Sequence, residues 1–240
     1  MPSILFRTRR PAFLPRLVLG LAATGLIGVA NAIAAAGGPV RPPAPAFDTP
    51  AGNAAIQTAV LSGGCFWGVQ GVFQHVRGVK QVLAGYAGGK PFTANYELVS
   101  TGTTGHAESV EIKFDPKVIS YGEILRVYFG VATDPTQLNA QYPDDGPQYR
   151  GEIFYMDASQ KAVAQRYIAQ LAAAKTFSRP IVTRVEPYSG FFKAEGYHQN
   201  YLIHHPDAGY IATYDLPKVA ALRAMFPADY RTQPIMAPAG

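Results

Sequence analysis

The one cysteine of this 240-residue chain is Cys65, in the run Gly63-Gly64-Cys65-Phe66-Trp67-Gly68. A thiolate is a strong nucleophile, and unpaired backbone N–H groups at the start of a helix stabilise its charge. The glycines before Cys65 leave room for another molecule to approach the backbone. The pattern predicts a reactive thiol; the alternative is an inert buried side chain, which is the common state of a free cysteine.

Two large aromatic residues, Phe66 and Trp67, directly follow the cysteine. A pair of this size at an exposed helix start is unusual for packing alone. Beside a nucleophilic sulfur, the two rings would form an apolar box for a methyl or methylthio group. We therefore expect them to bind a small sulfur-containing substrate.

An acidic residue, Glu108, shares the parity of the apolar positions in the alternating segment 107–114. One face of the predicted strand carries Val110, Ile112 and Phe114, and the other, read as solvated, carries Ser109, Glu111 and Lys113. A carboxylate on the apolar face loses hydration, so its pKa should rise to suit a general acid near neutral pH. The alternative is that Glu108 lies in water at a frayed strand end.

Other polar candidates carry weaker local signals. The loop 100–106 lacks the spacing and lysine of a phosphate-binding loop, and His106 is expected to be structural. No ligand pattern accompanies the histidines at 198, 204 and 205, so no metal site is expected. Tyr149 and Asp144 lie in a long loop, and nothing local distinguishes them from Tyr142 and Asp145.

The elements that must position these residues follow from periodicity and breakers. Strands are predicted at 56–61, 79–86, 107–114, 152–156 and 181–186. Helices are predicted from Cys65, at 120–131 behind the capping box Ser120-Tyr121-Gly122-Glu123, and at 159–174, 194–204 and 217–226. Strands and helices interleave without strict alternation, which predicts an α+β two-layer sandwich with a mixed central sheet covered by helices.

The N-terminal residues 1–32 have the pattern of a secretory signal peptide. Four arginines precede an apolar run over 17–29, which ends in Ala30-Asn31-Ala32. The run is short against the ~20 residues that span a bilayer. We expect export to the periplasm; the alternative is a signal anchor that holds the protein on the membrane, facing the periplasm.

The rest of the chain divides into a Pro/Ala/Gly-rich linker (33–54), one catalytic domain (55–231) and a flexible tail (232–240). Because four of the 21 basic residues and none of the 16 acidic ones lie before residue 33, 17 basic residues remain beside 16 acidic ones. This near-neutral balance gives no basis for nucleic-acid binding. Cys65 has no partner for an intramolecular disulfide, although exported proteins commonly form them.

Six separated motifs resemble those of a known family, the peptide methionine sulfoxide reductases of the A type. They are Gly64-Cys65-Phe66-Trp67-Gly68, Gly85-Tyr86-Ala87-Gly88-Gly89, Thr104-Gly105-His106-Ala107-Glu108, Asp134-Pro135-Thr136-Gln137, Gln148-Tyr149-Arg150 and Tyr197-His198-Gln199-Asn200-Tyr201. The resemblance covers residues 59–230. It implies an α+β two-layer fold and reduction of the S epimer of methionine sulfoxide, free or in proteins.

The resemblance also implies a role for each site residue. Cys65 would attack the sulfoxide sulfur and become a sulfenic acid, while Glu108 would protonate the oxygen. Tyr96 and Tyr149 would hydrogen-bond that oxygen, with support from Asp144. The implied substrate-binding residues are Phe66 and Trp67 around the methyl group, together with Gly64, Tyr197 and His198.

Relatives often carry a second cysteine that condenses with the sulfenic acid, and this chain has none after Cys65. Regeneration is therefore expected from an external thiol, such as a thioredoxin-type protein or a small dithiol, or from a cysteine on another protein. No other cofactor is expected. The substrates would be oxidised proteins and free methionine sulfoxide, and we expect a monomer. The long loop departs from the family pattern at Thr133, Asp145 and Pro147.

Two other functions account for part of the pattern. A thiol peroxidase would use Cys65 but would leave Phe66, Trp67 and Glu108 without a task. A binding module would capture oxidised methionine segments without turnover, consistent with the absence of a second cysteine. Reductase chemistry explains all of these residues together.

Overall fold

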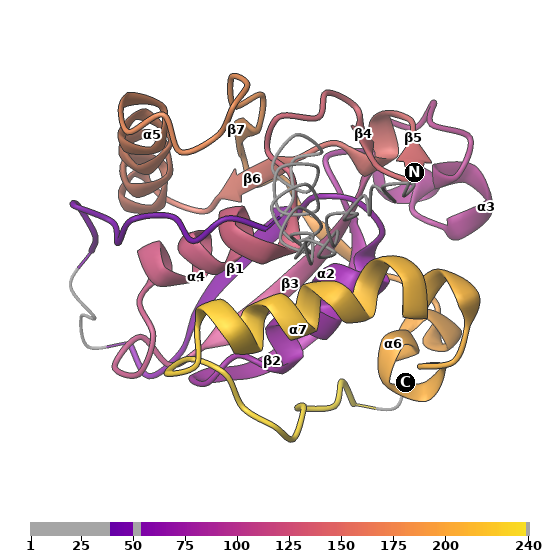
Figure 1. The fold of residues 1–240 in the computed structure, drawn as a ribbon. Coiled ribbons are helices and arrows are strands. Elements are labelled where there is room, and N and C mark those ends of the chain that lie inside the picture. The colour runs from indigo at the N-terminus through magenta and orange to yellow at the C-terminus, as the bar shows by residue number, and fades with distance from the viewer. Residues whose placement is uncertain (1–38, 50–53, 239–240) are drawn as a thin grey trace, which may run out of the picture. The chain divides into compact units, whose positions relative to one another are not determined.

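The computed structural model describes residues 39–49 and 54–238, whose central element is a six-stranded sheet (Figure 1). The spatial order is β7 (Arg184–Pro187), β6 (Glu152–Tyr155), β1 (Gln57–Ser62), β3 (Ala107–Phe114), β2 (Val79–Ala87) and β8 (Phe191–Lys193). Neighbouring strands are antiparallel except β6 and β7, which are parallel. The predicted α+β fold with a mixed sheet and covering helices is confirmed.

The main core lies between one face of this sheet and helix α2 (Phe66–Gln74). Alternation along β3 turns Val110, Ile112 and Phe114 into this core, where all three are fully buried. The opposite face of β3 differs from the expectation at Ser109, which is buried and donates a hydrogen bond from its hydroxyl to the Ala107 carbonyl. The strand that carries Glu108 is thus paired on both sides and buried over most of its length.

Capping side chains set the starts of two further helices. The predicted capping box opens α4 (Tyr121–Val127), since the Ser120 hydroxyl accepts a hydrogen bond from the Glu123 N–H at 3.2 Å. A π-helical turn continues α4 through Ala132. Asp157 caps α5 (Ala158–Ala173) in the same way. The last helix, α7 (Leu216–Met225), follows a second π-helical turn, Ile211–Asp215, and packs against α2 (Figure 1).

Short elements account for the differences from the predicted boundaries. The long loop contains the hairpin of β4 (Ala140–Gln141) and β5 (Asp144–Asp145), followed by a 3-10 turn, Pro147–Tyr149. The strand predicted at 181–186 begins only at Arg184. The helix predicted at 194–204 is wrong at its start. A 3-10 turn, Gly196–His198, precedes the short α6 (Tyr201–His204), because Asn200 is left-handed with φ 59°.

The described part of the predicted linker, residues 39–49, is extended but lies against the helices rather than free. The Pro42 carbonyl accepts a hydrogen bond from the Arg126 side chain at 2.9 Å, and the Pro43 carbonyl accepts one from the Tyr167 hydroxyl at 2.8 Å. Asp48 accepts a further bond from the Gly122 N–H at 3.0 Å. Proline-rich backbone keeps its carbonyl acceptors, and α4 and α5 supply the donors.

The predicted flexible tail is also attached as far as Ala237. The Ala237 N–H donates to the Asn200 side chain at 2.8 Å, and the Ile235 N–H donates to the Gln74 carbonyl at 3.0 Å.

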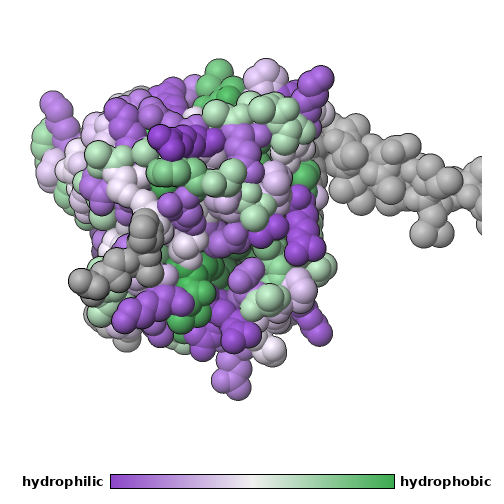
Figure 2. Space-filling view, turned by 90° about the vertical axis from the view of Figure 1, so that its left-hand side faces the viewer, coloured by the Kyte–Doolittle hydropathy of each residue, from purple (hydrophilic) through white to green (hydrophobic). Residues whose placement is uncertain are grey.

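On the side of the molecule that carries α5, hydrophobic side chains gather only in small areas among hydrophilic ones (Figure 2).

Within residues 39–49 and 54–238, no helix combines the length and hydropathy needed to cross a membrane. The predicted signal peptide, residues 1–32, and the linker residues 33–38 and 50–53 lie outside the described residues. Those assignments stay predictions.

Candidate active site

Cys65 lies where β1 gives way to α2 and is the N-cap residue of that helix, with 8% of its surface exposed. The turn before it requires glycine at Gly64, whose φ is 96° and whose Cβ would lie 2.8 Å from the side chain of Gln141. The Gly64 N–H donates to the Tyr149 carbonyl at 3.1 Å, which joins this turn to the long loop. The predicted place of the sulfur, at the start of a helix, is confirmed.

Burial raises the pKa of the Cys65 thiol well above its ordinary value, and the nearby carboxylates of Glu108 and Asp215 raise it further. The Trp67 N–H at the helix start and the ammonium group of Lys218 act in the opposite direction. The expectation that the helix start would leave a stabilised thiolate is therefore wrong for the resting site. The stabilising N–H is present, but desolvation outweighs it, and the sulfur is a thiol at neutral pH.

Glu108 points into the core as its parity predicted, with 3% of its surface exposed. Its Oε2 atom accepts a hydrogen bond from the Phe66 N–H at 3.0 Å. Burial raises the pKa of this carboxyl to about 8, against the lowering effect of that bond, and Asp144 and Asp215 raise it as well. The frayed-end alternative is excluded, because Glu108 is in register opposite Tyr86 of β2. The carboxyl is thus protonated at neutral pH and able to give up a proton.

The two tyrosines of the expected site approach Glu108 from different segments. Tyr96 opens the short helix α3 (Tyr96–Val99), and its N–H donates to Glu195 at 3.0 Å. Tyr149 ends the long loop and is tied to Gly64 through its carbonyl. Burial and the Glu108 carboxyl raise the pKa of both phenols, so both hydroxyls keep their protons. They can donate hydrogen bonds to an oxygen bound near Cys65.

Aromatic rings form one wall beside the sulfur. The Trp67 indole N–H donates to His198 Nδ1 at 3.1 Å, and the Trp67 ring stacks on Tyr201 at 3.8 Å between centroids. The His198 ring lies 4.9 Å from that of Phe66 and 4.5 Å from that of Tyr96. Burial lowers the pKa of His198, so its imidazole is neutral and accepts the indole proton.

The remaining expected residues lie at the edge of this wall. Tyr197 is 63% exposed, and its ring lies 4.1 Å from that of His198. Asp144 is half-buried and accepts a hydrogen bond from the Tyr210 hydroxyl, whereas its neighbour Asp145 is exposed. Burial raises the pKa of Asp144, against the lowering effects of Tyr210 and Lys218. The structure therefore distinguishes Asp144 from Asp145, which local sequence could not.

Four residues of the site were absent from the sequence prediction: Glu195, Tyr210, Asp215 and Lys218. Glu195 accepts hydrogen bonds from the Tyr86 hydroxyl at 2.7 Å and from the Tyr96 N–H. Asp215 forms an ion pair with Lys218, with 3.1 Å between Oδ1 and Nζ. Nothing in the local sequence marks these four residues. For Asp215 and Lys218, an acid, a proline and a lysine at the start of a helix are an ordinary combination.

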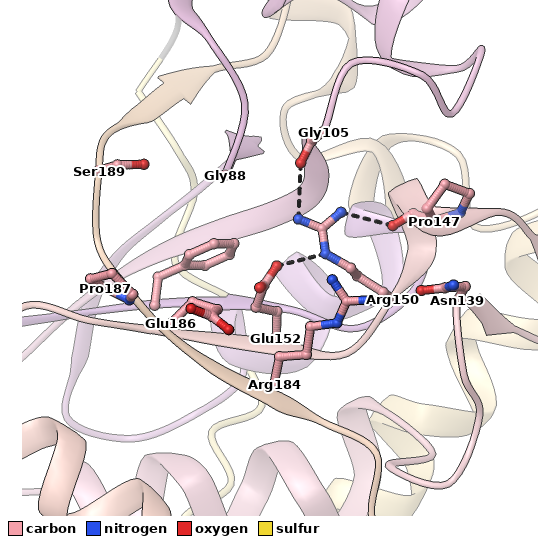
Figure 3. Close-up of a pocket in the computed structure, with 11 residues that line it drawn as sticks. Gly88, Gly105, Asn139, Pro147, Arg150, Glu152, Arg184, Glu186, Pro187 and Ser189 are labelled. Atoms are coloured by element: carbon pink, nitrogen blue, oxygen red, sulfur yellow. Dashed lines mark hydrogen bonds and ion pairs between the residues drawn. The ribbon is translucent and has the colours of Figure 1, made fainter.

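Arg150 anchors the long loop immediately after Tyr149. Its guanidinium donates to the Gly105 and Pro147 carbonyls and pairs with Glu152 at 2.6 Å (Figure 3). Alternation along β6 puts Ile153 in the main core and Glu152 on the opposite face, where these residues line a cleft of about 470 Å³. Neither Cys65 nor Glu108 lines that cleft. The buried ion pair thus holds Tyr149 in place from behind the sheet.

No grouping of three or more potential metal ligands occurs among the described residues. His106 has a structural place, because one ring nitrogen accepts from the Gly89 N–H at 3.2 Å and the other contacts the Lys90 carbonyl at 3.0 Å. The site thus combines a buried thiol, a protonated carboxyl, two phenols and an apolar wall. That set can transfer an oxygen atom to sulfur from a substrate whose polar oxygen faces the phenols and whose small apolar group faces the aromatic wall.

Comparison with known proteins agrees with this chemistry. The family model described as peptide methionine sulfoxide reductase matches residues 57–229. A peptide methionine sulfoxide reductase MsrA 2 of Mesorhizobium japonicum is 54% identical over 180 residues, which cover 75% of this chain and 92% of the relative. One of Synechocystis is 46% identical over 177 residues, covering 74% and 83%.

A solved structure shares the fold. Methionine sulfoxide reductase A of Corynebacterium diphtheriae superimposes with a TM-score of 0.55 at 32% identity, covering 66% of this chain and 79% of that one. The family match contains every residue expected for catalysis and substrate binding, from Gly64 to His198.

Proposed function

The chain belongs to the peptide methionine sulfoxide reductase family, and from this we propose how its residues perform the reaction. The protein is a peptide-methionine (S)-S-oxide reductase. The observation that carries the proposed mechanism is that a buried, protonated Glu108 on β3 is hydrogen-bonded to the N–H of Phe66, the residue that directly follows Cys65. A nucleophile and a proton donor are the two groups that cleavage of a sulfur–oxygen bond requires.

In the first step, the Cys65 sulfur bonds to the sulfoxide sulfur, Glu108 protonates the sulfoxide oxygen, and the thiol proton replaces the one that Glu108 gives up. The hydroxyl group then passes to Cys65 as the new S–S bond and the original S–O bond break, so Cys65 becomes a sulfenic acid and methionine leaves with its sulfur reduced. The hydroxyls of Tyr96 and Tyr149 hydrogen-bond the oxygen as negative charge develops on it. Phe66 and Trp67 enclose the methyl group.

The remaining residues orient these groups. His198 holds the indole of Trp67 through its hydrogen bond, and exposed Tyr197 extends the aromatic wall outward. Gly64 takes the left-handed conformation of the turn before Cys65 and allows the close packing of Gln141 against it. Asp144, bonded to Tyr210, adds negative charge that favours the protonated form of Glu108.

In the second step, an external thiol reduces the sulfenic acid. The chain holds a single cysteine, so the incoming thiol condenses with Cys65 to give a mixed disulfide and water. A second thiol equivalent then releases the Cys65 thiol and forms the external disulfide. A thioredoxin-type protein or a small dithiol can supply both equivalents.

Mass spectrometry after one equivalent of methionine sulfoxide tests this function. The reductase must yield methionine and add about 16 Da to Cys65, as expected for a sulfenic acid. A binding module would leave the substrate and the protein unchanged. A thiol peroxidase would gain the same mass from hydrogen peroxide but not from the sulfoxide. Either of the last two results would overturn the proposal.

We also propose that the protein is exported to the periplasm by a signal peptide within residues 1–32. The basic residues, the apolar run and Ala30-Asn31-Ala32 support this. Fractionation of cells that express the full chain, with sequencing of the N-terminus of the periplasmic product, tests it. A mature protein that starts after residue 32 is expected. Full-length protein in the membrane fraction would favour the anchor, and full-length protein in the cytoplasm would contradict export.

A further inference from the structure

A buried ion pair that the reaction scheme does not use lies against the first turn of α2. Asp215 has 0% of its surface exposed, and its Oδ1 lies 3.1 Å from Lys218 Nζ. A Cβ on Gly68 would lie 2.0 Å from that Oδ1 and 3.1 Å from that Nζ. Gly68 lies in the first turn of α2, and Cys65 is the N-cap residue of that helix. The charges are therefore beside the turn that begins at the reactive sulfur.

The carboxylate of Asp215 is not used in ordinary helix capping. Asp215 is the N-cap residue of α7, yet its side chain makes no cap hydrogen bond. Its Oδ2 atom is buried and has no hydrogen-bond partner among the described residues. Burying a charge this way is costly unless it is compensated. Lys218, whose side chain is mostly buried, supplies that compensation.

The sulfur is surrounded mainly by groups that oppose negative charge on it. The charged groups that act on it are Glu108 on β3, Asp215 before α7 and Lys218 on α7. The phenols of Tyr96 on α3, Tyr149 at the end of the long loop and Tyr210 before α7 also face it, since a charge on the sulfur raises the pKa of each. Among all these groups, Lys218 is the cation. Its field lowers the pKa of the Cys65 thiol, while burial, Glu108 and Asp215 raise it.

We propose that Lys218 acts electrostatically on the Cys65 sulfur. Asp215 holds Lys218 against α2, and its ammonium group stabilises the negative charge that this sulfur carries in each turnover. The inference rests on the proposed function in one respect, namely that Cys65 is the nucleophile of the reaction. The charge forms twice, once when the thiol loses its proton to attack the sulfoxide and again when an external thiol displaces Cys65 from the mixed disulfide.

The two members of the pair act on the sulfur with opposite signs, which separates an electrostatic role from a structural one. Removal of Lys218 leaves the Asp215 carboxylate uncompensated, so thiolate formation becomes harder. Removal of the Asp215 charge leaves the cation alone, so thiolate formation becomes easier. A structural role would disturb the site in the same direction in both variants.

The test is the pH profile of Cys65 alkylation by iodoacetamide in the full chain, which needs no sulfoxide. In Lys218→Met, the midpoint is expected to rise by roughly one pKa unit, which corresponds to about tenfold slower alkylation below the midpoint. In Asp215→Asn the midpoint is expected to fall. Lys218→Arg should keep the wild-type midpoint, and Lys80→Met removes a matched lysine that pairs with Asp115 at the surface.

A Lys218→Met profile that coincides with those of wild type and Lys80→Met would overturn the inference, as would midpoints that move the same way in Lys218→Met and Asp215→Asn. Circular dichroism checks folding. If Lys218→Met does not fold, Lys218→Gln makes the same comparison, because its amide still donates to Asp215. Methionine formation is measured separately, so loss of the reductase proposal and loss of this inference are distinguishable.

Discussion

Glu108 and Phe66 are joined by a hydrogen bond of 3.0 Å, in which the Phe66 N–H donates to the Glu108 Oε2 atom. Phe66 directly follows Cys65, so this bond fixes the proton donor of β3 to the helix start that carries the sulfur. One backbone N–H thereby ties the Glu108 carboxyl to the residue next to Cys65. Because the bond favours the charged carboxylate while burial opposes it, the pKa of Glu108 rests near 8 rather than higher.

Replacement of Glu108 by glutamine should slow the sulfoxide step by roughly 10²–10⁴-fold, the range of general-acid effects. The amide retains an acceptor for the Phe66 N–H but cannot protonate the sulfoxide oxygen. Single-turnover formation of methionine measures the effect. Glu111→Gln is the matched control, because Glu111 lies on the same strand with its side chain on the opposite face. Equal, small losses in both variants would end the assignment.

The buried carboxyl also predicts a pH dependence of stability. The pKa of Glu108 rises from an ordinary value near 4.5 to about 8 in the folded chain, so the native protein keeps a proton that the unfolded chain loses. The stabilisation is fully present below about pH 4.5 and is lost as the pH rises to about 8.

Urea unfolding of wild type and Glu108→Gln measures this loss. The free energy of unfolding of wild type should fall relative to the variant between those two pH values, by on the order of a few kcal/mol. The Glu111→Gln control should follow wild type. A constant difference between wild type and Glu108→Gln across the window would show that the carboxyl is ionised at neutral pH.

Removal of either phenolic hydroxyl should weaken stabilisation of the oxygen. Tyr96→Phe and Tyr149→Phe are each expected to lower the single-turnover rate by roughly 10- to 150-fold, since one hydrogen bond to a charged group contributes about 1.5–3 kcal/mol. Tyr142→Phe is the control, because Tyr142 lies in the same long loop with its side chain exposed. Rates that match this control would remove the tyrosines from the mechanism.

Gly68→Ala should destabilise the protein by roughly 1–3 kcal/mol, the usual effect of overpacking. The added methyl group would lie 2.0 Å from Asp215 Oδ1, and the buried carboxylate has little space in which to retreat. Gly209→Ala is the control, since nothing lies within 4 Å of its added Cβ. Urea unfolding of both variants measures the difference in stability. Equal unfolding midpoints for Gly68→Ala and Gly209→Ala would mean that Asp215 does not lie against α2.

The sequence predicted the parts of the fold whose signals are local. Alternation marked β3 with its observed bounds, and Ser120 with Glu123 marked the start of α4. The three residues of β8 were missed, because so short a strand has no measurable alternation. Residues 39–49 were taken as a free linker, because composition does not reveal that α4 and α5 offer donors to their carbonyls.

The site divides in the same way. Cys65 and Glu108 were identified from their position and parity, and the resemblance to the family supplied Tyr96, Tyr149 and Asp144. Asp215 and Lys218 could not be found, since they reach the sulfur only through packing of a C-terminal helix about 150 residues further along the chain. The prediction of a stabilised Cys65 thiolate was wrong for a related reason. The helix start was visible in the sequence, but the desolvation that outweighs it depends on tertiary burial.

The most direct measurement is the amount of methionine formed per chain from excess methionine sulfoxide without any reductant. Because Cys65 is the single cysteine, each chain should yield about one methionine and then stop, since one thiol accepts one oxygen as a sulfenic acid. Cys65→Ser should yield none, and addition of a dithiol should restart only the wild-type protein. More than one methionine per chain before the dithiol is added, or any methionine from Cys65→Ser, would contradict a mechanism that runs through this sulfur alone.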